Sequence, residues 1–166
     1  MPVVCGTTGW LDQFEMINKY CTTKNGTFIY SPNFSIGVNL FFRLNKFLAK
    51  EMFNKDEYKV SIFEKHHTKK IDKPSGTAIK IANDILKYSS FSEWSLDKDT
   101  NKLNIECERI GDEKGHHEVK FESENDSISI SHNAKSRKSF ALGAVMCSEW
   151  IYTVSYTHLR AHETVS

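Results

Sequence analysis

The chain has 166 residues, which is enough for one domain or for one complete domain with part of another. Its composition, with 39% hydrophobic and 26% charged residues, is ordinary for a soluble globular protein. A net charge of +1 argues against a broad nucleic-acid surface, and no apolar run approaches the roughly 20 residues that span a bilayer. No signal peptide opens the sequence, so we predict a cytoplasmic protein without a nucleic-acid or membrane partner.

The first thirty residues are typical of a parallel β-α-β unit. Residues 2–5 form a short apolar run that predicts a strand, and residues 27–31 predict a second one. Between them, apolar side chains recur at the spacing of one helix face, at Trp10, Phe14, Ile17 and Cys21. Because the chain opens inside a buried strand, we expect that the N-terminal part of a larger protein precedes it.

The pattern then changes to a long helix followed by a strand. A broad apolar face predicts a helix over residues 34–53, and alternation predicts a strand over residues 58–67. Pro74 blocks continuation, and Ser75 or Thr77 can cap the next helix, whose apolar face carries Ala78, Ile81, Ala82 and Ile85.

The second half of the chain predicts strands and a closing helix. A polar surface excursion over residues 87–102 precedes three strands, the last two joined as an antiparallel hairpin, at residues 102–110, 117–124 and 126–134. An apolar helix follows over residues 139–151. The polar residues 155–166 resemble translated cloning sequence, and we expect them to be non-native.

The four cysteines are widely spaced and form no Cys-x-x-Cys pair. Each lies in an apolar segment, which predicts buried free thiols in a reducing compartment. They are Cys5, Cys21, Cys107 and Cys147.

The strand over residues 58–67 ends in His66 and His67, and a lysine-rich loop follows. Ser75-Gly76-Thr77 then opens a helix, whose first backbone N–H groups lack intrahelical partners and lie at the positive end of the helix dipole. A glycine lets an anion approach these groups. Because histidine is the side chain best suited to move a proton near neutral pH, the segment predicts a pocket for a small anion.

Two simpler interpretations fit the same residues. A histidine pair before a lysine-rich loop is also typical of a solvated strand end, and Pro-Ser-Gly-Thr is also typical of a plain helix start. A zinc-dependent hydrolase is a further alternative, although the spacing lacks the one-face arrangement of His-Glu-x-x-His. Its ligands would be His66 or His67 with His116 or His117.

Taken together, five stretches resemble the 4-hydroxy-tetrahydrodipicolinate reductase (dihydrodipicolinate reductase) family. In order, they are VVCGTTGW, SPNFSIGVN, EKHHTKKIDKPSGTA, ERIGDEKGHHEV and SISHNAKSRKSFALGAV. They cover residues 2 to about 151, and the third is the most specific.

This resemblance implies an α/β enzyme that uses NADH or NADPH. A Rossmann dinucleotide-binding domain would be followed by an α+β substrate and tetramerisation domain with a mixed sheet. Residues 1–33 would be a C-terminal remnant of the first domain and residues 34–140 the second. Residues 141–154 would be a helix returning to the first domain, before the non-native tail at 155–166.

The resemblance also assigns cofactor contacts to two segments. The first lies beside the nicotinamide and the second lies at the hinge into the substrate domain; their residues are Gly6, Thr7, Thr8, Ser31, Pro32, Asn33 and Phe34. Taken alone, Gly-Thr-Thr-Gly is equally typical of a plain strand-to-helix turn.

On the substrate side, the resemblance implies two catalytic residues and four binding residues, and no metal. His66 matches the family's proton donor and acceptor, and Lys70 matches its second catalytic group. The substrate, a small dicarboxylate, would be bound by His67 and by the helix start at Ser75, Gly76 and Thr77. No role beyond packing or cleft lining is assigned to Arg109, His116 and Arg137.

The implied reaction is the NAD(P)H-dependent reduction of 4-hydroxy-tetrahydrodipicolinate to tetrahydrodipicolinate in lysine and diaminopimelate biosynthesis. The intact protein would be a homotetramer. Because the Gly-rich phosphate loop of a Rossmann domain is absent from the sequence, the alternative is a catalytically inert fragment that retains only substrate binding and oligomerisation.

Overall fold

The computed structural model describes residues 2–7 and 9–153 and divides the chain into two compact units. One unit contains the residues up to Ile36 together with the segment from Lys138 onward. The other contains Gly37–Arg137. Thr8 and the predicted non-native tail at 155–166 lie outside the described residues.

The first unit is built around a two-stranded parallel sheet, which confirms the predicted strand-helix-strand pattern. Trp10 packs edge-on against the rings of Phe28 and Tyr30 and so ties the helical segment to the second strand. The last helix packs against the first strand. The elements are β1 (Val3–Cys5), a 3-10 turn η1 (Leu11–Gln13), α1 (Phe14–Thr23), β2 (Phe28–Tyr30) and α4 (Lys138–Thr153).

Gly143 in α4 allows a close backbone approach within this unit. A Cβ atom added at Gly143 would lie 1.8 Å from the carbonyl oxygen of Phe34 and 2.7 Å from its carbonyl carbon. Both atoms belong to the backbone, so a side chain at this position would force α4 away from the segment that follows β2.

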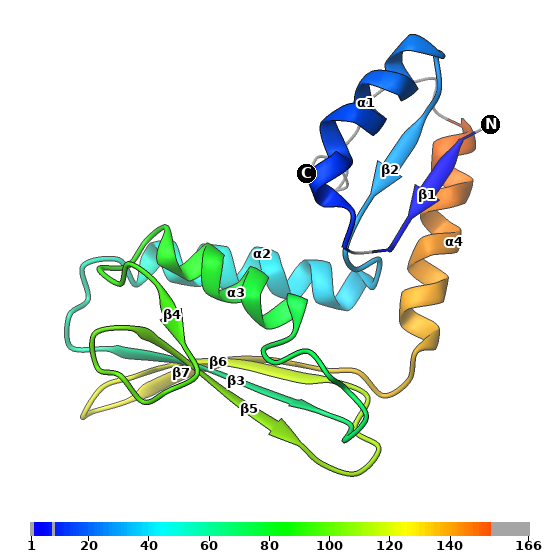
Figure 1. The fold of residues 1–166 in the computed structure, drawn as a ribbon. Coiled ribbons are helices and arrows are strands. Elements are labelled where there is room, and N and C mark those ends of the chain that lie inside the picture. The colour runs from blue at the N-terminus through cyan, green and yellow to red at the C-terminus, as the bar shows by residue number, and fades with distance from the viewer. Residues whose placement is uncertain (1, 8, 154–166) are drawn as a thin grey trace. The chain divides into compact units, whose positions relative to one another are not determined.

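The second unit contains a mixed five-stranded sheet in the order β4-β5-β3-β6-β7 (Figure 1). The central strand β3 pairs in parallel with β5 and antiparallel with β6, and β6 forms the predicted antiparallel hairpin with β7. The strands are β3 (Lys59–His66), β4 (Trp94–Ser95), β5 (Leu103–Arg109), β6 (His116–Glu122) and β7 (Ser127–Asn133).

Two helices, α2 (Ile36–Glu51) and α3 (Gly76–Leu86), cover one face of this sheet (Figure 1). Apolar residues of the helices and strands form the core, and Asn45 joins the two helices by donating to the carbonyl of Ile81 at 3.2 Å. The buried apolar residues include Val38, Phe41, Phe42, Ile62, Ile81, Ile85, Leu103, Ile105, Val119 and Phe121. None of the helices in the described part of the chain is long and apolar enough to cross a membrane.

Two predictions need correction. The cysteines are free, but all four are half-buried rather than buried. The surface excursion over residues 87–102 contains a strand, β4, because Trp94 and Ser95 add in parallel to the edge of β5.

Replacing Gly143 with alanine is expected to lower the free energy of unfolding of the first unit by about 2–3 kcal/mol, because the new Cβ overlaps the Phe34 carbonyl. Urea unfolding followed by circular dichroism measures the change. Gly76→Ala is the matched control, since a Cβ there meets nothing within 4 Å. A Gly143→Ala protein as stable as the parent chain would contradict the close approach of α4.

Candidate functional site

A row of polar side chains interrupts the apolar, helix-facing side of the sheet at the C-terminal end of β3. Glu64 pairs in register with Cys107 on one side and His117 on the other, and His66 pairs with Arg109. Side chains in register point to the same face, so all five polar groups lie on the face that α2 and α3 cover.

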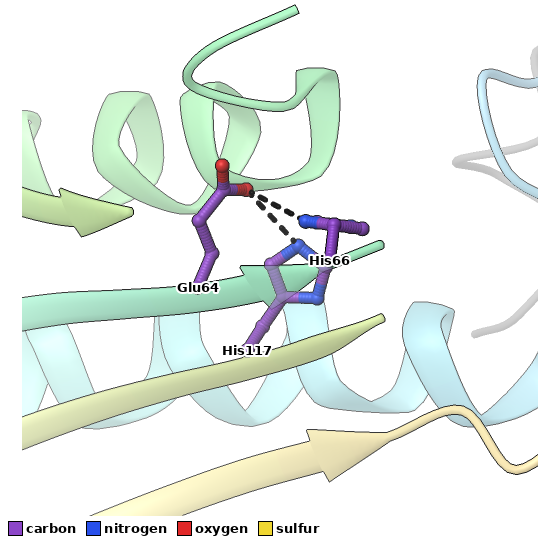
Figure 2. A group of neighbouring side chains, drawn as sticks. All are labelled: Glu64, His66 and His117. Carbon is purple, nitrogen blue, oxygen red and sulfur yellow. Dashed lines mark ion pairs between the residues drawn. The ribbon is translucent and has the colours of Figure 1, made fainter. Parts of the chain in front are cut away.

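Glu64 is the centre of this row, and its side chain is fully buried. One carboxylate oxygen, Oε1, accepts a hydrogen bond from Nη2 of Arg109 at 2.8 Å. The other, Oε2, lies 3.5 Å from Nδ1 of His66 and 3.6 Å from Nε2 of His117 (Figure 2). A single carboxylate therefore contacts a guanidinium on one side and two imidazole rings on the other.

The start of α3 meets the same carboxylate. The backbone N–H of Ser75 donates to both oxygens of Glu64, at 3.2 Å each. The Ser75 hydroxyl accepts from the backbone N–H of Ala78 at 3.1 Å, which confirms Ser75 as the N-cap, and it lies 3.1 Å from Nε2 of His117. The N–H and the hydroxyl of Ser75 are thus both engaged inside the protein.

The electrostatics of the cluster favour a charged Glu64 and a neutral His66. Burial by itself raises the pKa of Glu64, but four polar neighbours outweigh burial and hold that pKa well below its usual value. These neighbours are His117, Ser75, Arg109 and Cys107. Burial, and then the nearby charges of His117, Lys70 and Arg109, lower the pKa of His66 to about 4 against the opposing effect of Glu64.

Contacts in the loop after β3 hold two of the predicted site residues, His67 and Lys70, in place. Lys70 donates its backbone N–H to the carbonyl of His67 at 3.1 Å, and its ammonium group forms an ion pair with Asp72 at 2.8 Å. His67 Nε2 lies 3.4 Å from Nη2 of Arg137. The guanidinium of Arg109 also holds this loop, because it donates to the carbonyl of Asp72 at 2.7 Å.

The predicted cofactor segments lie together in the first unit, at the C-terminal ends of two parallel strands. A Cβ added at Gly6 would lie 3.6 Å from the ring of Phe34 and 4.0 Å from the carbonyl oxygen of Ser31. The Ser31 hydroxyl donates to the carbonyl of Asn33 at 2.7 Å, and the Thr7 carbonyl accepts from Trp10 at 2.6 Å. Pro32 is exposed. This edge of a parallel sheet is where dinucleotide cofactors bind in doubly wound folds.

Sequence analysis assigned no role to Glu64, only packing or cleft lining to Arg109, and only the zinc alternative to His117. Glu64 appears in the sequence as an ordinary charged residue of an alternating strand, while Arg109 and His117 are distant along the chain. Glu64 lies two residues after Ile62 and so shares its strand face, and the burial of Ile62 was predictable from alternation. The alternation of faces along β3 is therefore the signal that could have identified Glu64 as buried.

The structure brings together one of the histidine pairs of the zinc alternative, His66 with His117. One ligand atom each from Glu64, His66 and His117 lies within 4.8 Å of the others. The same carboxylate is already paired with the Arg109 guanidinium and the Ser75 N–H, which would oppose a divalent cation. His67 contacts Arg137 instead, and His116 lies beside Phe63 and Glu118.

A cavity of about 770 Å³ opens elsewhere in the second unit. It lies at the other end of β3, where Lys59 and Val60 begin the strand, and Phe121 and Lys98 also line it. The predicted site residues that the structure describes do not line this cavity.

The second unit is an α+β domain, in which two helices cover a mixed sheet. A buried cluster of one carboxylate and two histidines lies at the end of its central strand. The family described as "Dihydrodipicolinate reductase, C-terminus" matches residues 37–162. The chain therefore belongs to the dihydrodipicolinate reductase family.

Curated relatives support this assignment. The chain is 46% identical to a 4-hydroxy-tetrahydrodipicolinate reductase of Christiangramia forsetii over 153 residues, which cover 91% of the chain and 64% of that protein. It is 36% identical to the reductase of Lawsonia intracellularis, covering 90% of the chain and 61% of that protein. The chain thus spans less than two thirds of the length of these relatives.

A solved structure gives the same result for the fold. The dihydrodipicolinate reductase of Paenisporosarcina sp. TG-14, described as bound to dipicolinate, matches with a TM-score of 0.73 and 25% sequence identity. The match covers 98% of this chain and 64% of that one.

The free energy of unfolding is expected to fall as the pH is lowered from about 6.5 to about 4. In this window the unfolded chain binds a proton at His66 that the folded chain excludes, because the folded pKa is the lower one. His66→Gln should make this dependence shallower. Glu64, whose folded pKa is depressed, loses its stabilising contribution only below about pH 4.5, so the two effects separate.

Denaturant midpoints measured at closely spaced pH values give the slope for both proteins. An unchanged slope in the His66→Gln protein would show that the folded chain does not exclude this proton.

Proposed function

We propose that this chain carries the substrate side of a reductase that converts 4-hydroxy-tetrahydrodipicolinate to tetrahydrodipicolinate in lysine and diaminopimelate biosynthesis. The observation that carries the proposal is the convergence of His66 and the start of α3 on one buried carboxylate, Glu64. The family assignment and the names of the relatives favour the reductase over an inert fragment.

The substrate carboxylates would be held by cationic and amide groups at the end of β3. Gly76 and Thr77 contribute backbone N–H groups at the start of an eleven-residue helix, where the helix dipole favours an anion. Gly76 is exposed and leaves its surroundings open, so a ligand oxygen can approach its backbone. His67 would bind the second carboxylate, and Ser75 would act alongside by fixing the start of the helix.

His66 and Lys70 would supply the proton and the positive charge that the reaction needs. In the free chain His66 is neutral near pH 7, because its pKa lies at about 4. Two substrate carboxylates nearby would raise that pKa, so His66 would take up its proton when substrate binds and deliver it as a general acid. Asp72 holds the Lys70 ammonium in place to stabilise negative charge during the transfer.

The residues of the first unit suit a nicotinamide cofactor, NADH or NADPH. Gly6, Thr7 and Thr8 and the segment Ser31, Pro32, Asn33 and Phe34 would hold it, since the described members of both segments lie at the C-terminal ends of β1 and β2. When bound, the cofactor supplies a hydride. In the net reaction a hydride takes the place of the substrate hydroxyl, and the hydroxyl leaves with one proton as water.

We further propose that the complete protein is a cytoplasmic homotetramer that assembles through the sheet of the second unit. The face of the sheet opposite α2 and α3 carries half-buried Phe63, Lys65, Glu118 and Lys120, which suits a polar contact between copies.

The proposal predicts that the chain binds pyridine-2,6-dicarboxylate (dipicolinate). Lys70→Ala is expected to weaken binding about tenfold, because a charge-assisted contact is lost. Titration calorimetry measures both affinities. Lys98→Ala, which removes a lysine at the other cavity, is the matched control and should leave binding unchanged. A chain that folds but does not bind dipicolinate would contradict the proposed function.

Gly76→Val is expected to preserve the fold and to lower dipicolinate affinity about tenfold or more. The Cβ of the new side chain meets no atom of the described residues within 4 Å, so we expect the valine to crowd what approaches the helix start. Calorimetry gives the affinity and thermal unfolding checks the fold. Unchanged affinity would mean that the start of α3 has only a structural role.

The inert-fragment alternative predicts the same binding but no chemistry. Mixing the chain with NADH or NADPH and 4-hydroxy-tetrahydrodipicolinate, and following nicotinamide absorbance, separates the two.

A further inference from the structure

Glu64 connects the proton donor, the ammonium group and the helix start that we place on the substrate side. It lies 3.5 Å from Nδ1 of His66, and it accepts from the N–H of Ser75, directly before the amides of Gly76 and Thr77. Its partner Arg109 donates to the carbonyl of Asp72, whose carboxylate holds Lys70. The proton donor, the ammonium group and the helix start are therefore each linked to one buried carboxylate by a chain of contacts with at most two intervening residues.

The geometry around His66 favours one tautomer. Its Nδ1 is sealed from solvent and has no hydrogen-bond partner among residues 2–7 and 9–153, while Oε2 of Glu64 faces it at 3.5 Å. A lone pair on Nδ1 would point at a negative charge, whereas an N–H there is attracted to it. The neutral ring therefore carries its hydrogen on Nδ1 and leaves its lone pair on Nε2.

The Nε2 edge of the same ring lies beside Gly115. A Cβ at this position would lie 3.3 Å from Nε2 and 3.4 Å from the neighbouring ring carbon of His66. Gly115 has a φ of +137°, a conformation that favours glycine. Glycine at this position thus keeps the Nε2 edge free of a covering side chain.

We propose that Glu64 is a positioning residue that holds His66 in the Nδ1–H tautomer and thereby makes Nε2 the nitrogen that exchanges a proton with substrate. The identity of the substrate rests on the proposed function; the tautomer does not. The arrangement follows the general rule that a buried carboxylate orients a histidine by accepting from one ring nitrogen while the other does the chemistry.

Replacing Glu64 with glutamine is expected to place a hydrogen-bond donor, instead of an acceptor, opposite Nδ1 of His66. Arg109 donates to Oε1, whereas the N–H of Ser75 donates to both oxygens, so it is the guanidinium that keeps the amide oxygen at the site of Oε1. The amide NH₂ group then takes the place of Oε2 and faces Nδ1 of His66. A donor in this position favours a lone pair on Nδ1, so the hydrogen should move to Nε2.

Long-range ¹H–¹⁵N correlation spectra of the histidine-labelled chain, recorded above pH 7 after treatment with a chelator, read the tautomer directly. The expected result is Nδ1–H for His66 in the parent chain and predominantly Nε2–H in Glu64→Gln. Glu108→Gln, which removes an exposed carboxylate paired with Lys65, is the matched control and should retain the parent tautomer. The Nε2–H form in the parent chain would overturn the proposal, and the parent spectrum decides this even if Glu64→Gln does not fold.

Dipicolinate titration separates this inference from the proposed function. Glu64→Gln should bind about tenfold more weakly than the parent chain and Glu108→Gln. If the parent chain fails to bind dipicolinate but shows Nδ1–H, the substrate assignment fails and the role of Glu64 stands. If Glu64→Gln folds, binds normally and keeps Nδ1–H, the role of Glu64 is disproved while the substrate assignment stands.

Discussion

The buried carboxylate of Glu64 is the constraint on which the second unit depends. A charged carboxylate without partners costs several kcal/mol in a protein interior, and removing one member of a buried ion pair typically costs about 3–5 kcal/mol. Here the charge is compensated by the Arg109 guanidinium, the Ser75 N–H and two imidazole rings. These partners come from four different elements, so the carboxylate fixes how those elements meet.

The mixed topology of the sheet brings the partners together. Because β3 and β5 run in parallel, His66 and Arg109 lie at the same end of neighbouring strands. Because β6 runs antiparallel to β3, His117 at its beginning lies opposite Glu64 near the end of β3. An all-parallel or all-antiparallel arrangement of these three strands would move one of the partners to the far end of the sheet.

Local patterns predicted the elements well, because each depends on periodicity and capping within a short segment. The strand predicted over residues 58–67 is confirmed as β3, and of the two predicted caps, Ser75 and Thr77, the structure has Ser75. Long-range pairing could not be read from one sequence, so Arg109 received no role beyond packing or cleft lining and Glu64 was overlooked. The same limit applies to the cysteines, whose half-buried positions depend on how the elements pack.

The pairing of Glu64 also favours the correct register of the strands. A slip of β5 or β6 by one residue would turn Arg109 or His117 to the opposite face, leaving an uncompensated negative charge under α3. Misaligned versions of the sheet are therefore penalised at the place where the ligand would bind. The charge of Glu64 therefore supports both the chemistry of the pocket and the correct alignment of the strands.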